Sequence, residues 1–207
     1  MLLKLSVVYT TQSNLQRKGD FFMVKDMTEG KPGRLILEFA IPLLLGNLFQ
    51  QFYSLVDTAI VGKFLGVDQL AAVGSTGSIN FLIIGFCMGI CSGFAIPIAQ
   101  RFGAKDESGM RRCVANSAWV SVIFAVVLTI VTVLLCRNIL QWMRTPENII
   151  DDAWMYIVII FAGIPVTILY NLTSAIIRAM GDSKTPVYFL VMSALLNIVL
   201  DLFFILV

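Results

Sequence analysis

The protein has 207 residues, of which 58% are hydrophobic and only 14% are charged. A soluble domain of this length needs a charged shell that such a composition does not supply, so an ordinary soluble globular protein is excluded. The formal net charge of +2 carries no basic excess for nucleic acid, and the complete lack of histidine excludes catalytic groups, metal sites and proton relays built on that residue.

Apolar blocks of about 20 residues, the length that crosses a hydrocarbon core of about 30 Å, recur along the chain. They predict an all-α membrane protein with about five transmembrane helices. Residues 1–34 are polar and are predicted to form a cytoplasmic leader, ahead of a transmembrane lobe over 35–207. The last block is still apolar at Val207, so we expect the sequence to be truncated within the fifth helix. The predicted helices cover about residues 35–62, 70–100, 113–140, 153–177 and 187–207.

Local signals add three details to this pattern. The charged segment 101–112 is predicted to be a loop or a surface helix. Pro165 lies inside the fourth predicted helix, where a proline removes a backbone hydrogen bond and favours a kink. A stripe of small residues in the second helix predicts close packing against another helix. Its members are Gly85, Gly89 and Gly93.

Lysine and arginine predict the orientation of the chain. If the N-terminus lies inside, twelve of the fifteen basic residues fall in inside segments. The remaining three, Lys63, Arg137 and Arg144, fall in outside loops. Such an excess is typical of the cytoplasmic side of a multi-pass protein. We therefore predict a plasma-membrane protein with a cytoplasmic N-terminus.

Two acids, Asp57 and Asp201, lie inside predicted spans. A charged residue at the centre of a span costs about 2.5–3.5 kcal/mol on insertion scales, so it normally faces a polar cavity or a partner. Both helices run from inside to outside, and a rise of 1.5 Å per residue places both acids in the outer half of the membrane. We expect them to share one cavity. The alternative for Asp57 is an acid that snorkels to the outer interface.

Polar side chains accompany each acid at helical spacing, which places them on single faces. Serine and threonine in such stripes are typical of hydrogen bonding between helices, whereas the two asparagines favour a hydrated cavity. The first helix carries Asn47, Gln50, Ser54 and Asp57. The fourth carries Thr167, Asn171, Ser174 and Arg178, and the fifth carries Ser193, Asn197 and Asp201.

A carboxyl group in such a cavity can take up and release a proton as its exposure changes, because loss of water favours its neutral form. Alternatively, Asp201, Asn197 and Asp57 would supply oxygen ligands to Na⁺. The sequence contains no Walker A motif, dinucleotide fingerprint or metal-ligand cluster. We therefore expect no enzyme and no cofactor, with H⁺ or Na⁺ as a coupling ion.

Several motifs together point to one family. They are F-A-I-P-L-L-L-G-N-L-F-Q-Q-F-Y-S-L-V-D-T-A-I-V-G at 39–62, L-A-A-V-G at 70–74, P-I-A-Q-R-F-G-A-K-D at 97–106, R-A-M-G-D-S-K-T-P at 178–186 and L-N-I-V-L-D at 196–201. In these motifs the chain resembles the multidrug and toxic compound extrusion (MATE) family of secondary transporters, over about residues 27–207. The resemblance implies twelve helices in two lobes of six, of which this chain would hold most of the first. It also implies that Asp57, Asn171, Asn197 and Asp201 line a cation site.

The resemblance predicts a cation-coupled antiporter that exports cationic or amphipathic drugs and toxins. Its partners would be the bilayer, a small-molecule substrate and the C-terminal lobe of the same protein. Asn47, Gln50, Ser54 and Thr167 are predicted to line the cavity. One alternative is a lipid-linked oligosaccharide flippase of the same superfamily, although such cavities favour cationic side chains. Another is a membrane scaffold subunit that transports nothing.

Overall fold

The computed structural model describes residues 31–64 and 66–206, apart from the side chains of 202 and 204–206. Most of the predicted leader, residues 1–30, therefore lies outside the described residues. All the regular structure in the described part is helical. The helices are α2 (Pro32–Phe64), α3 (Val67–Gly103), α4 (Glu107–Trp142), α5 (Ile150–Ala162), α6 (Ile164–Ala179) and α7 (Lys184–Leu206).

The helices extend further into polar sequence than the apolar blocks predict. α2 already begins at Pro32, within the segment 1–34 that was predicted to be a leader. Proline suits the first position of a helix because its missing N–H would have no partner there. Of the two structures predicted for 101–112, a loop or a surface helix, the helix is found for most of the segment, because only residues 104–106 separate α3 from α4. Apolar blocks mark the part of a helix inside the hydrocarbon, and these helices continue beyond it.

The fourth predicted span is a bent pair of helices. α5 and α6 meet at Gly163 with an angle of 44° between them, so the single helix expected over 153–177 is divided. Pro165 lies in the first turn of α6, where it has no N–H to bond to the carbonyl four residues earlier. The favoured kink is therefore present, and it is sharp enough to separate two helices.

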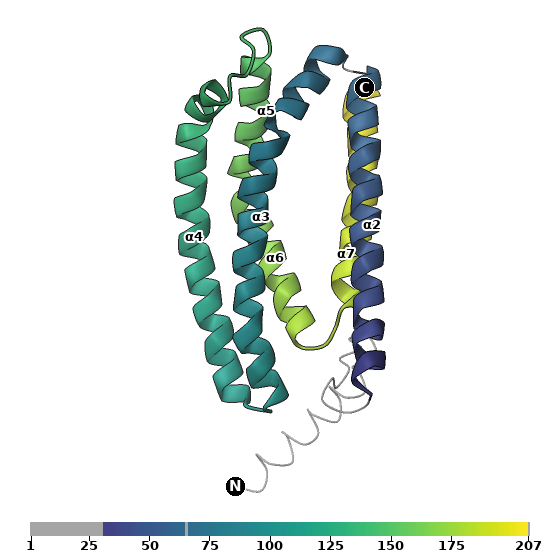
Figure 1. Cartoon of the computed structure of the whole chain (residues 1–207), viewed down its shortest axis with the longest axis vertical. Helices are drawn as coiled ribbons and strands as arrows, with labels where there is room; N and C mark the ends of the chain where they lie inside the picture. The colour runs from purple at the N-terminus through teal and green to yellow at the C-terminus, as the bar shows by residue number, and fades with distance from the viewer. Residues whose placement is uncertain (1–30, 65, 207) are drawn as a thin grey trace, which may run out of the picture.

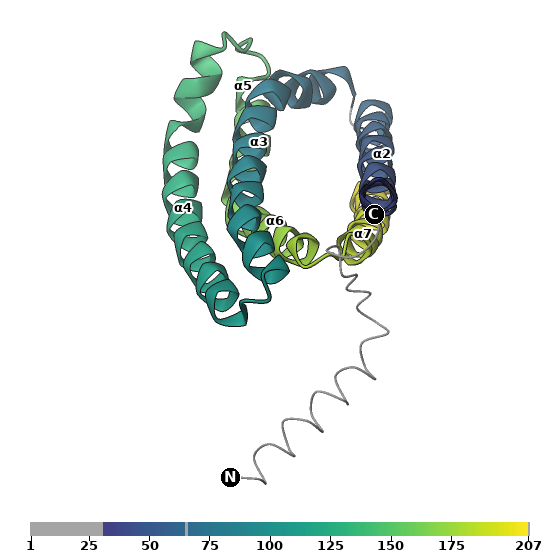
Figure 2. The same ribbon diagram turned by 60° about the horizontal axis from the view of Figure 1, so that its bottom comes forward.

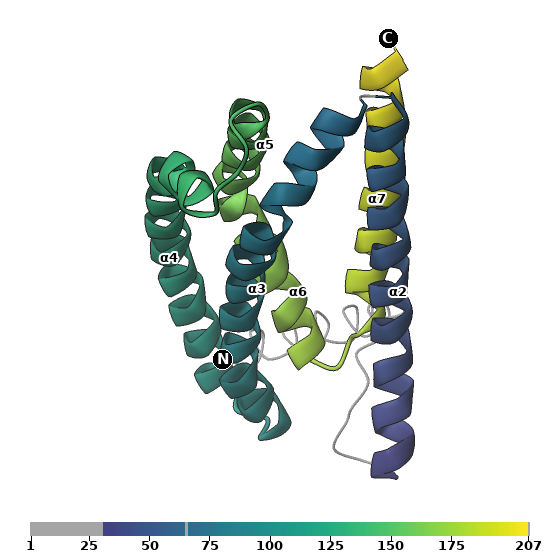
Figure 3. The same cartoon turned by 45° about the horizontal axis from the view of Figure 1, so that its top comes forward.

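The six helices form two groups (Figures 1 and 2). α3, α4, α5 and α6 pack together around a continuous apolar core that includes Cys87, Phe161 and Ile164. α2 and α7 lie side by side and run in the same direction (Figures 1 and 3). Within the described residues, α2 contacts only α7 and α3, and α7 contacts only α2 and α6.

The dimensions of the helices fit a membrane protein. Four of the described helices are each long and apolar enough to cross a bilayer, and the bent pair of α5 and α6 meets the same requirement when taken together. Large apolar side chains such as Phe52, Phe81 and Leu134 are exposed, as expected for surfaces that face lipid. The prediction of an all-α membrane protein with about five spans is confirmed.

The glycine stripe of α3 does not pack as predicted. A Cβ atom added at Gly85, Gly89 or Gly93 would have no other atom within 4 Å in the described part of the chain. The close approach is made instead by Gly46 of α2, where an added Cβ would lie 3.0 Å from the Cγ2 of Val187 on α7. Among the described residues, the close helix contact is therefore made by a glycine of α2 and not by the glycine stripe of α3.

Candidate functional site

The polar groups of α2 and α7 meet along one line of contact. The hydroxyl of Tyr53 donates a hydrogen bond to the Oδ1 of Asn197. One turn further along both helices, the carboxyl groups of Asp57 and Asp201 lie within hydrogen-bonding reach of each other. The two acids expected to share a cavity are thus neighbours on adjacent helices.

This pairing follows from the parallel arrangement of α2 and α7. Both helices rise 1.5 Å per residue, so parallel neighbours keep their register from one turn to the next. A contact between Tyr53 and Asn197 therefore brings the residues four positions later, Asp57 and Asp201, opposite each other. Gly46 makes the same approach possible near the start of α7, because it has no side chain to hold Val187 away.

The two carboxyl groups are only partly exposed. Asp57 and Asp201 both have intermediate exposure. The Oδ2 of Asp201 is buried and has no hydrogen-bond partner among the described residues. A buried oxygen without a donor is costly, so this atom is placed to accept a proton, a cation or a donor from a bound molecule.

Tyr53 also belongs to this site, and a second tyrosine, Tyr156, lies further away on α5. Tyr53 lies one turn before Asp57 on the same face of α2. The phenol of Tyr156 on α5 lies within electrostatic reach of Asp57 and Tyr53. We did not predict either residue from the sequence. The spacing of four from Tyr53 to Asp57 was a usable signal, whereas nothing in the apolar sequence around Tyr156 sets it apart.

The other predicted site residues are placed less closely. Thr167 donates to the carbonyl of Gly163, and Asn171 donates through its Nδ2 to the carbonyl of Thr167, so both bond within their own helical segment. Neither makes a hydrogen bond to the two acids in the described part of the chain. The three predicted cavity-lining residues of α2 all have exposed side chains. These are Asn47, Gln50 and Ser54.

The predicted Na⁺ ligands are only partly assembled. Among the described residues there is no group of three or more His, Cys, Asp or Glu side chains that could hold a metal ion. Asp57 and Asp201 are close together, and the Oδ1 of Asn197 already accepts from Tyr53. Binding of Na⁺ by this set stays a prediction.

A partly buried pair of carboxyl groups between lipid-facing helices is typical of membrane transporters, in which ionisable residues within spans mark ion pathways. The chain belongs to the MatE family, whose model matches residues 42–203.

Known proteins resemble the chain over most of its length. It is 40% identical over 162 residues to the probable multidrug resistance protein YoeA of Bacillus subtilis, which covers 78% of this chain and 35% of that protein. It is 31% identical to YpnP of the same organism, over 87% of this chain and 40% of that protein. A solved outward-facing multidrug resistance MATE family transporter of the MOP superfamily matches with a TM-score of 0.79 and 30% identity. That match covers 85% of this chain and 39% of the solved one, so the chain spans well under half the length of its relatives.

Proposed function

We propose that the chain forms the ion-coupling part of an antiporter that exports cationic or amphipathic compounds in exchange for H⁺ or Na⁺. The proposal depends on one observation, the carboxyl groups of Asp57 and Asp201 facing each other between α2 and α7. Membership of a family with relatives named as multidrug resistance proteins supports the class of substrate.

The chemistry of exchange follows from two adjacent carboxylates. Two negative charges at hydrogen-bonding distance repel each other, and a shared proton removes that repulsion. A bound Na⁺ or an organic cation removes it equally well. Coupling ion and cationic substrate would therefore compete for Asp57 and Asp201, and such competition is what an antiporter requires.

Opening the α2–α7 contact would change the side of the membrane from which ions and substrate reach the carboxyl groups. The proton favours the paired, closed arrangement, because the neutral and charged carboxyl groups can then hydrogen-bond. Loss of the proton favours separation of the two helices and admits a cation. A ligand that prefers one arrangement shifts the equilibrium only by its difference in affinity for the two arrangements.

We also propose that the N-terminus is cytoplasmic and that the protein lies in the plasma membrane. The turns at 104–106 and 180–183 lie at the same end of the molecule as the start of α2 (Figure 1). Lys63 at the end of α2 and Arg144 after α4 lie at the opposite end. The excess of basic residues at the first end supports this orientation. The C-terminal lobe would complete the substrate path.

The test uses the protein at its full natural length in membrane vesicles loaded with a fluorescent cationic dye. A proton or sodium gradient is imposed, and dye movement is compared between the wild type, Asp57→Asn and Asp201→Asn. Asp68→Asn is the matched control, because Asp68 is exposed in the first turn of α3. We expect each variant of the pair to lose at least tenfold in gradient-driven transport, and the control to lose nothing. The gradient that drives the dye identifies the coupling ion.

The other outcomes separate the alternatives. Equal dye movement in all variants would show that the carboxyl pair is structural and that the coupling mechanism is wrong. If even the wild type moves no dye, an anionic cargo becomes the next test. One relative, from Shewanella oneidensis, is named an FAD transporter, so a flavin nucleotide and a lipid-linked oligosaccharide are the two cargoes to offer. No movement of any of them would favour a scaffold subunit.

A further inference from the structure

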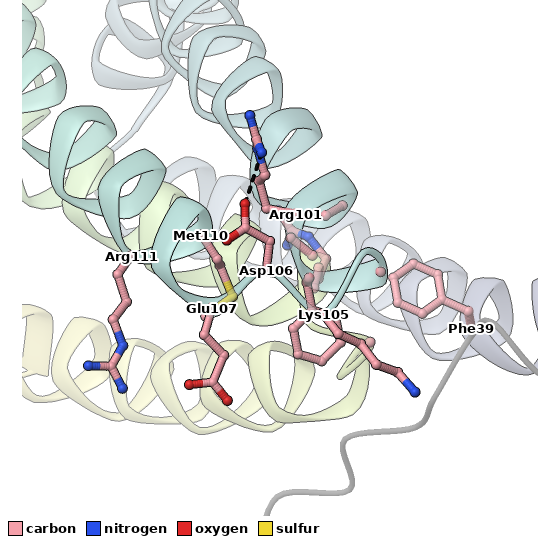
Figure 4. Close-up of a pocket in the computed structure, with 13 residues that line it drawn as sticks. Phe39, Arg101, Lys105, Asp106, Glu107, Met110 and Arg111 are labelled. Carbon is pink, nitrogen blue, oxygen red and sulfur yellow. Dashed lines mark hydrogen bonds and ion pairs between the residues drawn. The ribbon is translucent and has the colours of Figure 1, made fainter.

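A pocket distant in the fold from the carboxyl pair lies where α3 and α6 end and α4 begins (Figure 4). Its volume is about 700 Å³. Neither Asp57 nor Asp201 lines it. The charged residues that line it are Arg101, Lys105, Asp106, Glu107, Arg111 and Arg178.

The cations of this pocket outnumber its acids, and one acid is already fully engaged. Asp106 accepts hydrogen bonds from the Gly109 N–H and the Ser108 hydroxyl, and it forms an ion pair of 2.9 Å with Arg101. Figure 4 shows this pair, with Arg111 and Lys105 extending away from it on opposite sides of the pocket. Asp106 therefore has little capacity left to neutralise the other cations.

Three cations of the pocket lack a partner. The side chains of Lys105, Arg111 and Arg178 make no hydrogen bond or ion pair with any residue that the structure describes, and Glu107 is the other acid on the lining. Arg178 is the most significant of the three because it is half-buried. A guanidinium withdrawn from water without an acid beside it favours an anion as its partner.

The wall of the pocket is apolar and belongs to membrane-spanning helices. Phe39 of α2, Phe102 of α3 and Met110 of α4 line it beside the charged groups. The ends of spanning helices lie at the height of the lipid headgroups, and basic pockets between such helices bind phosphate headgroups. A soluble anion would have no use for the apolar wall, whereas a lipid places its acyl chains there.

We propose that this pocket binds the headgroup of an anionic phospholipid. Arg178 contacts the phosphate oxygens, Arg111 and Lys105 add positive charge on the two sides of the pocket, and the upper part of an acyl chain lies against Phe39 and Met110. Arginine suits this task because its planar donors match phosphate oxygens in pairs. The proposal requires only that the chain spans a membrane, so it does not depend on the coupling mechanism.

The test is retention of lipid by the purified full-length protein. Native mass spectrometry counts bound phosphatidylglycerol against phosphatidylcholine for the wild type, Arg178→Gln and Arg111→Gln. Arg137→Gln is the matched control, because Arg137 is an exposed arginine near the other end of α4. We expect the wild type to prefer phosphatidylglycerol. Each pocket variant should bind it about fivefold more weakly, because a basic residue near an anionic lipid contributes on that scale.

Several results would overturn the proposal. Equal retention of the two lipids by the wild type would do so, as would an equal loss in Arg137→Gln. Competition by inorganic phosphate at the same concentration as the lipid would assign the pocket to a soluble anion instead. If Arg178→Gln fails to fold, Arg178→Lys and Arg111→Gln decide the question, and unchanged lipid binding in Arg111→Gln would contradict it. Dye transport measured beside lipid binding separates this proposal from the antiporter mechanism.

Discussion

The bundle of α3 to α6 and the pair of α2 and α7 are held together by different contacts. The bundle shares a core in which Cys87, Phe161 and Ile164 are fully buried. Among the described residues, that core takes no member from α2 or α7. The pair is joined by the close approach of Gly46 to Val187 and by polar contacts.

This difference indicates where movement costs least. Shape-matched apolar packing fixes the bundle, because any shift opens voids along the whole core. Polar contacts between helices in a membrane are worth about 0.6 kcal/mol each, so the contact of Tyr53 with Asn197 can be exchanged for other partners at low cost. The carboxyl pair therefore lies in the part of the molecule that is cheapest to rearrange, beside a part that stays rigid.

The strongest test of this difference removes a large side chain from each group of helices. Phe161→Ala leaves a cavity of roughly 100 Å³ in the bundle, and the lost apolar contacts together with this cavity cost about 3–5 kcal/mol. Phe52→Ala is the control on α2, where the ring is 67% exposed, and we expect a loss below about 0.5 kcal/mol. Reversible unfolding in mixed micelles measures both. Equal losses would show that the two groups are packed alike.

A second test acts on the α2–α7 contact itself. Gly46→Ala places a methyl group 3.0 Å from the Cγ2 of Val187, and such overpacking costs about 1–2 kcal/mol. Val187→Ala in the same protein should restore most of the loss, which a double-mutant cycle of unfolding free energies measures. Gly85→Ala is the control, because an added Cβ meets open space there. The close packing would be contradicted if Gly46→Ala were as harmless as Gly85→Ala.

A smaller effect is expected from the hydrogen bond between Tyr53 and Asn197. Tyr53→Phe keeps the ring and removes only the donor, so unfolding free energy should fall by about 0.6 kcal/mol. Tyr188→Phe is the matched control, because the Tyr188 side chain on α7 is exposed and its hydroxyl makes no hydrogen bond in the described part of the chain. The same unfolding assay compares them, and equal values would remove Tyr53 from the contact.

The smallest effect concerns the exposed start of α4 and depends on pH. Hydrogen bonds from the Gly109 N–H and the Ser108 hydroxyl, together with Arg101, hold the pKa of Asp106 below its ordinary value. A carboxyl group whose pKa is lower in the folded protein stabilises the fold at pH values above its unfolded pKa of about 3.9. That contribution is lost as the pH falls through the lowered pKa.

Thermal unfolding between pH 7 and pH 2 measures the loss at Asp106. Asp106→Asn should be slightly less stable than the wild type at pH 7, and the difference should shrink as the pH falls below about 4. Asp68→Asn, at an exposed position in the first turn of α3, serves as the control. A difference that stays constant across this range would rule out the charge of Asp106 as its cause.

The sequence was sufficient for much of the fold because a membrane imposes simple lengths. Apolar blocks identified five spans, and Pro165 indicated the break that separates α5 from α6. Two helices begin earlier than predicted, α2 at Pro32 and α4 at Glu107, because polar residues can continue a helix beyond the hydrocarbon. The glycine stripe did not predict the close contact between described helices, since small residues show that a face can pack closely but not which helix will pack against it.

The motifs of the chain resembled those of the MATE family, and composition and spacing alone determined that it is a helical membrane protein in which Asp57 and Asp201 are the unusual groups. These are properties of single helices, which hydropathy and the 3.6-residue period describe. Only the tertiary structure decided that α2 and α7 run parallel in a register that joins the two acids, and that Tyr53 lies beside them. Register between helices depends on which side chains interlock across the contact, and the pattern along one helix does not contain that information.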